Sequence, residues 1–234
     1  MADRNAEKFF AALSRSGPDT TQVQKMLREY KDADMKAVVN YTDVGGMTPL
    51  HRAARIGNPD LVNMLMNQKA DANAATFPSR APGSFTPLQC LAEADMSSMD
   101  KEDMRETTRL LLNGMTTTAL GQRTTKGANV FHLVVSRGNL ECLEEIVEMV
   151  FPLHSLSTIG KWLNATSQKG KTVLDLARYN KQIAKVIRDY GGVNAYEGEE
   201  EEEERNYVPE WHHWNRRYHR AQWRSWENQN KWTR

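Results

Sequence analysis

An internal repeat is the feature that most constrains what this chain can fold into. Four segments share a glycine, then Thr or Asn two or three residues later, then an apolar run: GMTPLHRAA from 46, GSFTPLQCLA from 83, GANVFHLVV from 127 and GKTVLDLA from 170. These Thr and Asn residues, Thr48, Thr86, Asn129 and Thr172, are spaced by 38, 43 and 43 residues. Such periods predict pairs of short helices that bury their apolar faces by stacking on one another. The repeat therefore predicts an elongated stack of helix pairs.

The unit at residues 46–74 carries the clearest helix signals. Thr48 can cap the first helix with its hydroxyl, and Pro49 at the first helical position loses no needed N–H. Leu50 begins the apolar stripe of this helix, and Gly57 suits the left-handed residue at its end. The buried side of the second helix is predicted from five apolar residues, Leu61, Val62, Met64, Leu65 and Met66.

The Thr-Pro-Leu-His sequence at residues 48–51 and the order of these units resemble the ankyrin repeat. The resemblance covers about residues 4–193. It implies an all-α, ankyrin-type helical solenoid of about five helix-pair units with extended loops. The expected segments are a degenerate N-terminal cap at 4–42, units near 43–74, 83–115, 124–150 and 167–192 within a 1–193 solenoid, an acidic polyglutamate linker at 194–206, and a Trp/Arg-rich interaction tail at 207–234.

Three insertions lengthen the loops of this predicted solenoid. Residues 77–83 (FPSRAPG) predict an extended finger, whose Phe77 and Arg80 are candidate partner contacts. Residues 93–103 lengthen a turn inside the third unit, and residues 151–170 predict an extra short helix around Trp162. The alternative for all three is sequence drift in surface loops.

No pattern indicates catalysis, a metal site or a bound cofactor. The resemblance implies that His51 and His132 are structural residues that bond the backbone of neighbouring turns, and that Gly138 ends a helix as Gly57 does. Cys142 is expected to be a small buried apolar residue. Cys90 lies one step beyond the matching helix position and is expected to be partly exposed.

Asn73 is a candidate modification site. By the resemblance, it occupies the position that asparaginyl hydroxylases modify in ankyrin proteins, and Leu65 lies eight residues earlier as in that pattern. The alternative is an ordinary loop asparagine that hydrogen-bonds its own turn.

The tail has an unusual composition. Residues 197–204 hold seven Glu in eight positions, and residues 205–234 carry seven Arg or Lys, two Glu and five of the six tryptophans. Aromatic and Arg residues dominate protein interfaces. The candidate partner-binding residues are Trp211, Trp214, Arg216, Arg217, Tyr218, Trp223 and Trp226.

Three uses of this tail remain open at this point. It can anchor the chain to another protein or fold back on its own solenoid, it can bind RNA or single-stranded nucleic acid by phosphate contacts and stacking, or it can lie at a membrane surface. The polyglutamate run repels phosphates and anionic lipids and so disfavours the last two.

Composition excludes several classes of protein. The mean hydropathy of −0.69 and the absence of a long apolar run argue against a membrane span. Two cysteines make no disulfide framework, and no secretory signal is seen, so an intracellular, cytoplasmic or nuclear protein is expected. The sequence thus predicts a non-enzymatic scaffold, adaptor or complex subunit that binds one or more proteins, with a nucleic-acid-associated factor as the alternative.

Overall fold

The computed structural model describes residues 2–14, 19–30, 32–79, 83–94 and 99–195 of the 234-residue chain. These residues belong to the first of two units into which the chain divides, Met1–Ala195. The second unit, Tyr196–Arg234, contains the predicted acidic linker except for its first two residues, and the whole Trp/Arg-rich tail. Residues 196–234 therefore lie outside the described residues.

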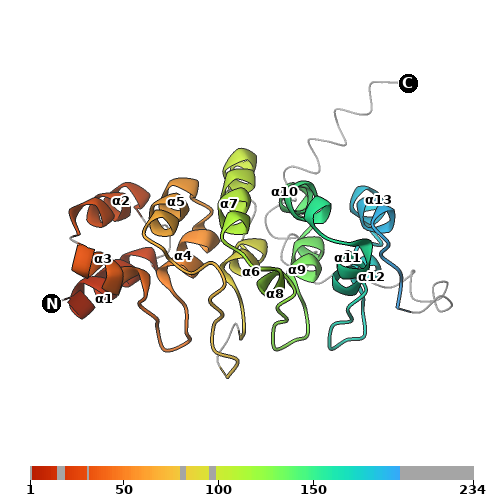
Figure 1. Ribbon diagram of the computed structural model, residues 1–234, viewed down its shortest axis with the longest axis horizontal. Coiled ribbons are helices and arrows are strands. Elements are labelled where there is room, and N and C mark those ends of the chain that lie inside the picture. Colours follow the sequence, from red (N-terminus) through yellow and green to blue (C-terminus); the bar gives the residue numbers. More distant parts are fainter. Residues whose placement is uncertain (1, 15–18, 31, 80–82, 95–98, 196–234) are drawn as a thin grey trace, which may run out of the picture. The chain divides into compact units, whose positions relative to one another are not determined.

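The described residues form helices and no strands, which confirms the predicted all-α solenoid. Its five helix pairs are α1 (Ala2–Leu13) with α2 (Thr20–Glu29), α4 (Pro49–Ile56) with α5 (Pro59–Asn67), α6 (Pro87–Ala92) with α7 (Lys101–Asn113), α9 (Val130–Arg137) with α10 (Leu140–Val150), and α12 (Val173–Leu176) with α13 (Lys181–Asp189). Figure 1 shows the second helices of the pairs in one row, the first helices in another, and long loops extending beyond the first helices.

Polar caps explain where the helices begin. The first helices of the last four pairs start after Thr48, Thr86, Asn129 and Thr172, whose side chains accept the N–H of the residue three places on. All five second helices start after Asp or Asn caps: Asp19, Asn58, Asp100, Asn139 and Asn180. Thus the start of each of these helices is set by the cap residue that precedes it.

Gly57 ends α4 as the sequence predicts. Its φ of +71° is in the left-handed region, where its N–H bonds the carbonyl oxygens of Ala53 and Ala54. A Cβ at this position would also lie 2.2 Å from the sulfur of Met99. The left-handed backbone therefore favours glycine here, whereas the Met99 side chain is flexible and could move away from a Cβ.

One continuous core runs through the stacked pairs. It contains the buried Phe9 of α1, Leu50 of α4 and Phe131 of α9. Ala53 and Ala54 of α4 are fully buried, and α4 packs against α6. Their small side chains let the two first helices approach closely.

Extra helices lie in the links between pairs: α3 (Asp32–Val39), α8 (Thr117–Leu120), the 3-10 turn η2 (Phe151–Leu153) and α11 (Leu156–Leu163). Helix α11 confirms the helix predicted around Trp162, whose buried ring stacks on Phe131 with 5.9 Å between centroids. No helix among the described residues is both long and apolar enough to cross a membrane.

Leu65 provides a direct test of the stacked core, because its side chain is fully buried in α5. Leu65→Ala should lower the free energy of unfolding by about 2–5 kcal/mol, since it removes apolar contacts and leaves a cavity. Urea denaturation measures this loss. Asn63→Ala, on the exposed side of the same helix, is the matched control and should change stability by less than about 0.5 kcal/mol. Equal effects of the two substitutions would contradict the packing.

Candidate partner-binding surface

Three first helices, α4, α6 and α9, are joined to the loop of the next pair by a side chain in their first turn. Nδ1 of His51 accepts the Thr48 N–H at 3.1 Å, so Nε2 carries the proton and donates to the Phe85 carbonyl oxygen at 2.9 Å. In the next pair, Gln89 accepts the Thr86 N–H through Oε1 and donates through Nε2 to the Gln122 carbonyl oxygen at 2.7 Å.

The same arrangement recurs in the last two pairs. His132 accepts the Asn129 N–H, and its Nε2 lies 3.2 Å from the Lys171 carbonyl oxygen. Asp175 accepts the Thr172 N–H at 2.7 Å and the N–H of Ala195 at 3.2 Å. Since no further pair follows within the described residues, this last side chain fixes the end of the solenoid itself.

Burial keeps these imidazoles neutral. Loss of solvation lowers the pKa of His51 to about 4, against the smaller opposing effect of its bond to the Phe85 carbonyl oxygen. Burial also lowers the pKa of His132. Both ring nitrogens of each residue contact protein groups, so these histidines hold loops in place.

The loops before the last four first helices, here called fingers 1 to 4, contain the described residues 42–47, 75–79 with 83–85, 122–128 and 165–171. Backbone bonds connect them in series: Phe77 N–H donates to the Gly45 carbonyl oxygen at 2.8 Å, Thr125 N–H to Gly83 at 3.4 Å, and Gln168 N–H to Lys126 at 2.9 Å. Because of these bonds, the fingers form one connected surface rather than four independent loops.

The first two fingers expose apolar side chains at equivalent positions. Val44 is 85% exposed and Phe77 is 48% exposed. Gly46, with φ of +77°, lies against Phe77, and a Cβ there would approach the Phe77 ring to 2.8 Å. The backbone bond at Gly45 thus brings two exposed apolar residues together on neighbouring fingers.

The family model for the ankyrin repeat matches residues 45–77, which contain the end of finger 1, α4, α5 and the start of finger 2. This match falls on the unit with the complete Thr-Pro-Leu-His motif, within a stack of five helix pairs. The chain contains an ankyrin repeat within an all-α solenoid. Ankyrin repeats are non-catalytic modules that bind other proteins.

The ankyrin solenoid also resembles part of a much larger protein. It is 27% identical over 153 residues to the tyrosine-protein kinase HTK16 of Hydra vulgaris. The match covers 65% of this chain and 18% of the kinase, so the chain spans less than a fifth of that protein.

Behind the ankyrin fingers lies a small aromatic patch. Phe10 and Tyr41 pack together with 5.2 Å between ring centroids, and the Arg52 guanidinium lies 5.3 Å from the Phe10 ring. Arg52 is also 3.7 Å from Asp43 of finger 1. The patch thus joins the base of finger 1 to α1 and α4.

The expectation that Cys90 is partly exposed is wrong. Cys90 is 3% exposed because it packs with Phe10 and Met47 in this patch, and burial raises the pKa of its thiol to about 12. Cys142 is fully buried in α10 as expected, and burial raises its pKa to about 12 as well. Neither thiol is poised for reaction at neutral pH.

Asn73 links two ankyrin units. Its Oδ1 accepts the Thr116 N–H at 2.7 Å, and its Nδ2 donates to the Gly114 carbonyl oxygen at 3.0 Å and to Asp71 at 3.2 Å. The amide therefore bonds both its own turn and the end of α7. Hydroxylation at Asn73 stays a prediction.

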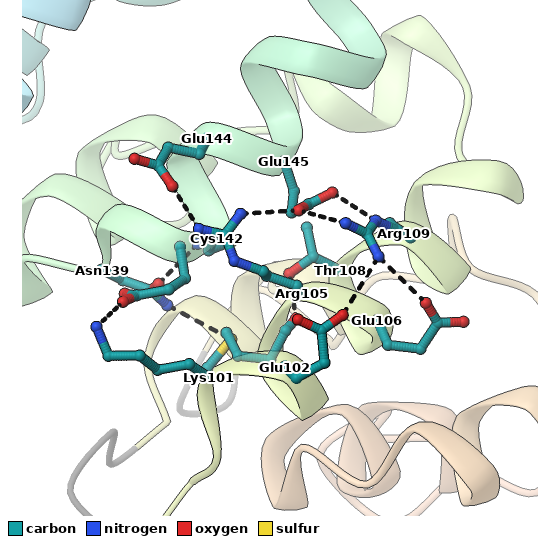
Figure 2. Close-up of polar contacts among 12 residues, drawn as sticks. Lys101, Glu102, Arg105, Glu106, Thr108, Arg109, Asn139, Cys142, Glu144 and Glu145 are labelled. Atoms are coloured by element: carbon teal, nitrogen blue, oxygen red, sulfur yellow. Dashed lines mark hydrogen bonds and ion pairs between the residues drawn. The ribbon is translucent and has the colours of Figure 1, made fainter.

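The opposite face, made by the second helices, carries ion pairs that sequence reasoning missed. Figure 2 shows Glu145 of α10 between Arg105 and Arg109 of α7. Glu145 is 1% exposed and accepts from Arg105 Nη1 at 3.0 Å, and from Arg109 Nε at 2.7 Å and Nη2 at 2.9 Å. Glu144 also accepts from Arg105, and Glu141 pairs with Lys101. These contacts lock α7 onto α10.

Some predicted site residues cannot be placed. Arg80 of finger 2 and all seven candidate residues of the Trp/Arg-rich tail lie outside the described residues. Of the predicted loop contacts, Phe77 lies at the finger surface. Within the described part of the chain, no group of three or more His, Cys, Asp or Glu is arranged to hold a metal ion.

The low pKa of His51 predicts acid sensitivity. The unfolded chain binds a proton near pH 6.5, whereas the folded chain does so near pH 4, so this contribution to stability is present above pH 6.5 and lost between pH 6.5 and 4. The loss from His51 should be on the order of 3 kcal/mol.

Urea denaturation at pH 7.5, 5.5 and 4.5 measures this dependence. His51→Gln is the informative variant, because Gln89 makes the equivalent bonds in the next unit. Its stability should fall less between pH 7.5 and 4.5 than that of the unaltered chain. The same pH slope in both proteins would contradict the assignment to His51.

Proposed function

We propose that this ankyrin-repeat protein is a non-catalytic scaffold or assembly subunit that binds other proteins through its finger surface and through its C-terminal segment. The observation that carries the proposal is the pair Val44 and Phe77, exposed on neighbouring fingers that are joined backbone to backbone. An intracellular adaptor role, in the cytoplasm or nucleus, belongs to the same proposal.

Rigidity is what makes these two residues good anchors. A flexible loop loses conformational entropy when it binds, whereas Phe77 is already held by its backbone bond to Gly45 and by contact with Gly46. An aromatic side chain that fills a partner's pocket commonly contributes about 2 kcal/mol or more. The finger pair can therefore supply much of the binding energy at a small ordering cost.

The C-terminal segment supplies a second contact in this proposal. This part of the proposal is supported by the sequence of the segment, which contains five tryptophans interspersed with arginines. Both residue types are enriched in interface hot spots. The alternative, binding of RNA or single-stranded DNA by the same residues, makes a different prediction for salt. Phosphate contacts weaken steeply as salt rises, whereas an aromatic anchor in a protein pocket changes little.

Loss of the finger anchor tests the scaffold role. The full chain carrying Val44→Asp and Phe77→Asp should recover less than about a tenth of the native partners in quantitative co-purification, since each change places a charge in an apolar contact. Leu156→Asp is the matched control, because Leu156 is 71% exposed on the α11 insertion and not on a finger. Circular dichroism checks that all variants fold. Equal recovery with the unaltered chain would refute the finger surface.

Loss of two tail tryptophans tests the second contact. Trp211→Ala with Trp214→Ala should weaken binding to a co-purified partner by about 30-fold or more, in line with loss of at least about 2 kcal/mol. Asn228→Ala in the same segment is the control. The factor by which these two substitutions weaken binding should be similar at 0.1 and 0.5 M NaCl, because an aromatic anchor in a protein pocket changes little with salt. A steep salt dependence, with nuclease-sensitive recovery, would instead favour the nucleic-acid alternative.

A further inference from the structure

The last two fingers are cationic. Finger 3 carries Arg123 and Lys126, and finger 4 carries Lys169 and Lys171. No Asp or Glu occurs between residues 121 and 140 or between residues 149 and 174. Arg123, Lys126 and Lys169 are exposed to solvent. The positive charge of these fingers is therefore not offset by acidic residues nearby in the sequence.

These two fingers are held together more tightly than the others. Gln168 donates its N–H to the Lys126 carbonyl oxygen at 2.9 Å and its Nε2 to the Thr125 carbonyl oxygen at 2.6 Å. Arg123 donates Nε to the Gly127 carbonyl oxygen at 2.9 Å and an Nη to the carbonyl oxygen of Thr166. Arg123 thus helps to hold a pre-formed platform on which Lys126 and Lys169 are exposed.

Within the described part of the chain, no carboxylate lies within ion-pair distance of Arg123, Lys126 or Lys169. The cations of α7 differ, because Arg105 and Arg109 pair with glutamates of α10 (Figure 2). Exposed cations that no described carboxylate neutralises can attract anionic groups from outside.

Equivalent finger positions change in character along the solenoid. Val44 and Phe77 in the first two fingers are apolar, whereas Thr125 and Gln168 occupy the same positions beside the cations of the last two. Stacked helices lie about 8–10 Å apart, and an extended chain covers roughly 3.3 Å per residue. A segment that crosses all four fingers is therefore about ten residues long.

We propose that the finger surface binds an extended, acidic polypeptide segment of its partner, with apolar side chains on Val44 and Phe77 and carboxylates on Arg123, Lys126 and Lys169. The inference deepens the proposed scaffold function by stating the chemistry of the partner. A protein segment is favoured over nucleic acid because the last two fingers offer no aromatic side chain for base stacking, and because the first two fingers expose the apolar Val44 and Phe77.

The test uses the full chain and two fluorescein-labelled ten-residue peptides. Each has two leucines at one end and four glutamates at the other, in opposite sequence orders, so that either binding direction is sampled. Fluorescence anisotropy measures affinity at 0.05 and 0.5 M NaCl. Because the protein carries its own acidic run, a chain with the five glutamates at 200–204 changed to glutamine is titrated in parallel.

The decisive variant combines Lys126→Glu with Lys169→Glu. Its matched control combines Lys181→Glu with Lys185→Glu, which makes the same change of net charge on exposed lysines of α13. The finger variant should bind at least 10-fold more weakly at 0.05 M NaCl, and the control should stay within about 3-fold. The difference should shrink at 0.5 M NaCl, where screening acts over a few ångströms.

Several results would overturn the proposal. They are absence of peptide binding to both parallel chains, equal losses in the finger and α13 variants, and undiminished binding of peptides with glutamine in place of glutamate. Displacement of the peptide by a ten-nucleotide single-stranded DNA at lower concentration than by unlabelled peptide would favour nucleic acid instead. If the peptides fail while Val44→Asp with Phe77→Asp still abolishes partner recovery, the scaffold function stands and the acidic partner is refuted.

Discussion

The hydrogen bond from the first turn of one helix to the finger of the next pair is the interaction on which the structure depends. His51, Gln89 and His132 each accept the N–H of their own cap residue and bond a carbonyl oxygen of the following finger. One side chain therefore satisfies the backbone N–H of the cap residue at the start of its helix, and it also sets the distance to the next pair. Each such side chain is buried, so breaking its bonds would leave polar groups without a hydrogen-bond partner, not even water. The positions of neighbouring pairs therefore depend on each other.

Because these bonds hold the stack together, the side chains at the finger tips are left for function. The backbone ladder through Gly45, Gly83 and Lys126 needs carbonyl and N–H groups, which every residue except proline supplies. Side chains at the tips can therefore vary from Val44 to Gln168 without cost to the stack. The same scaffold can thus serve unrelated partners, and the choice of partner lies in the exposed residues rather than in the fold.

Local signals made much of the fold predictable. Thr48, Pro49 and Gly57 mark the ends of a helix by their own chemistry, and the spacing of Thr48, Thr86, Asn129 and Thr172 indicates the stack. Helices α3 and α8 were not predicted because they lie in links that carry no repeated pattern. Cys90 was misplaced because its burial depends on Phe10, which is distant in sequence. The pairing of Glu145 with Arg105 and Arg109 likewise joins residues about 40 positions apart, which no local pattern reveals.

The two faces of the solenoid treat charge in opposite ways. On the second helices, Glu145 is buried between two arginines, and the attraction between these groups is used to hold α7 against α10. Such charges contribute little field to the surroundings, because each is neutralised within a few ångströms. On the fingers, Lys126 and Lys169 extend from loops whose shape is already maintained by backbone bonds, so their charge is not needed for folding. Charge that stabilises the fold and charge that can recognise a partner are thus separated onto different helices and loops of the same stack.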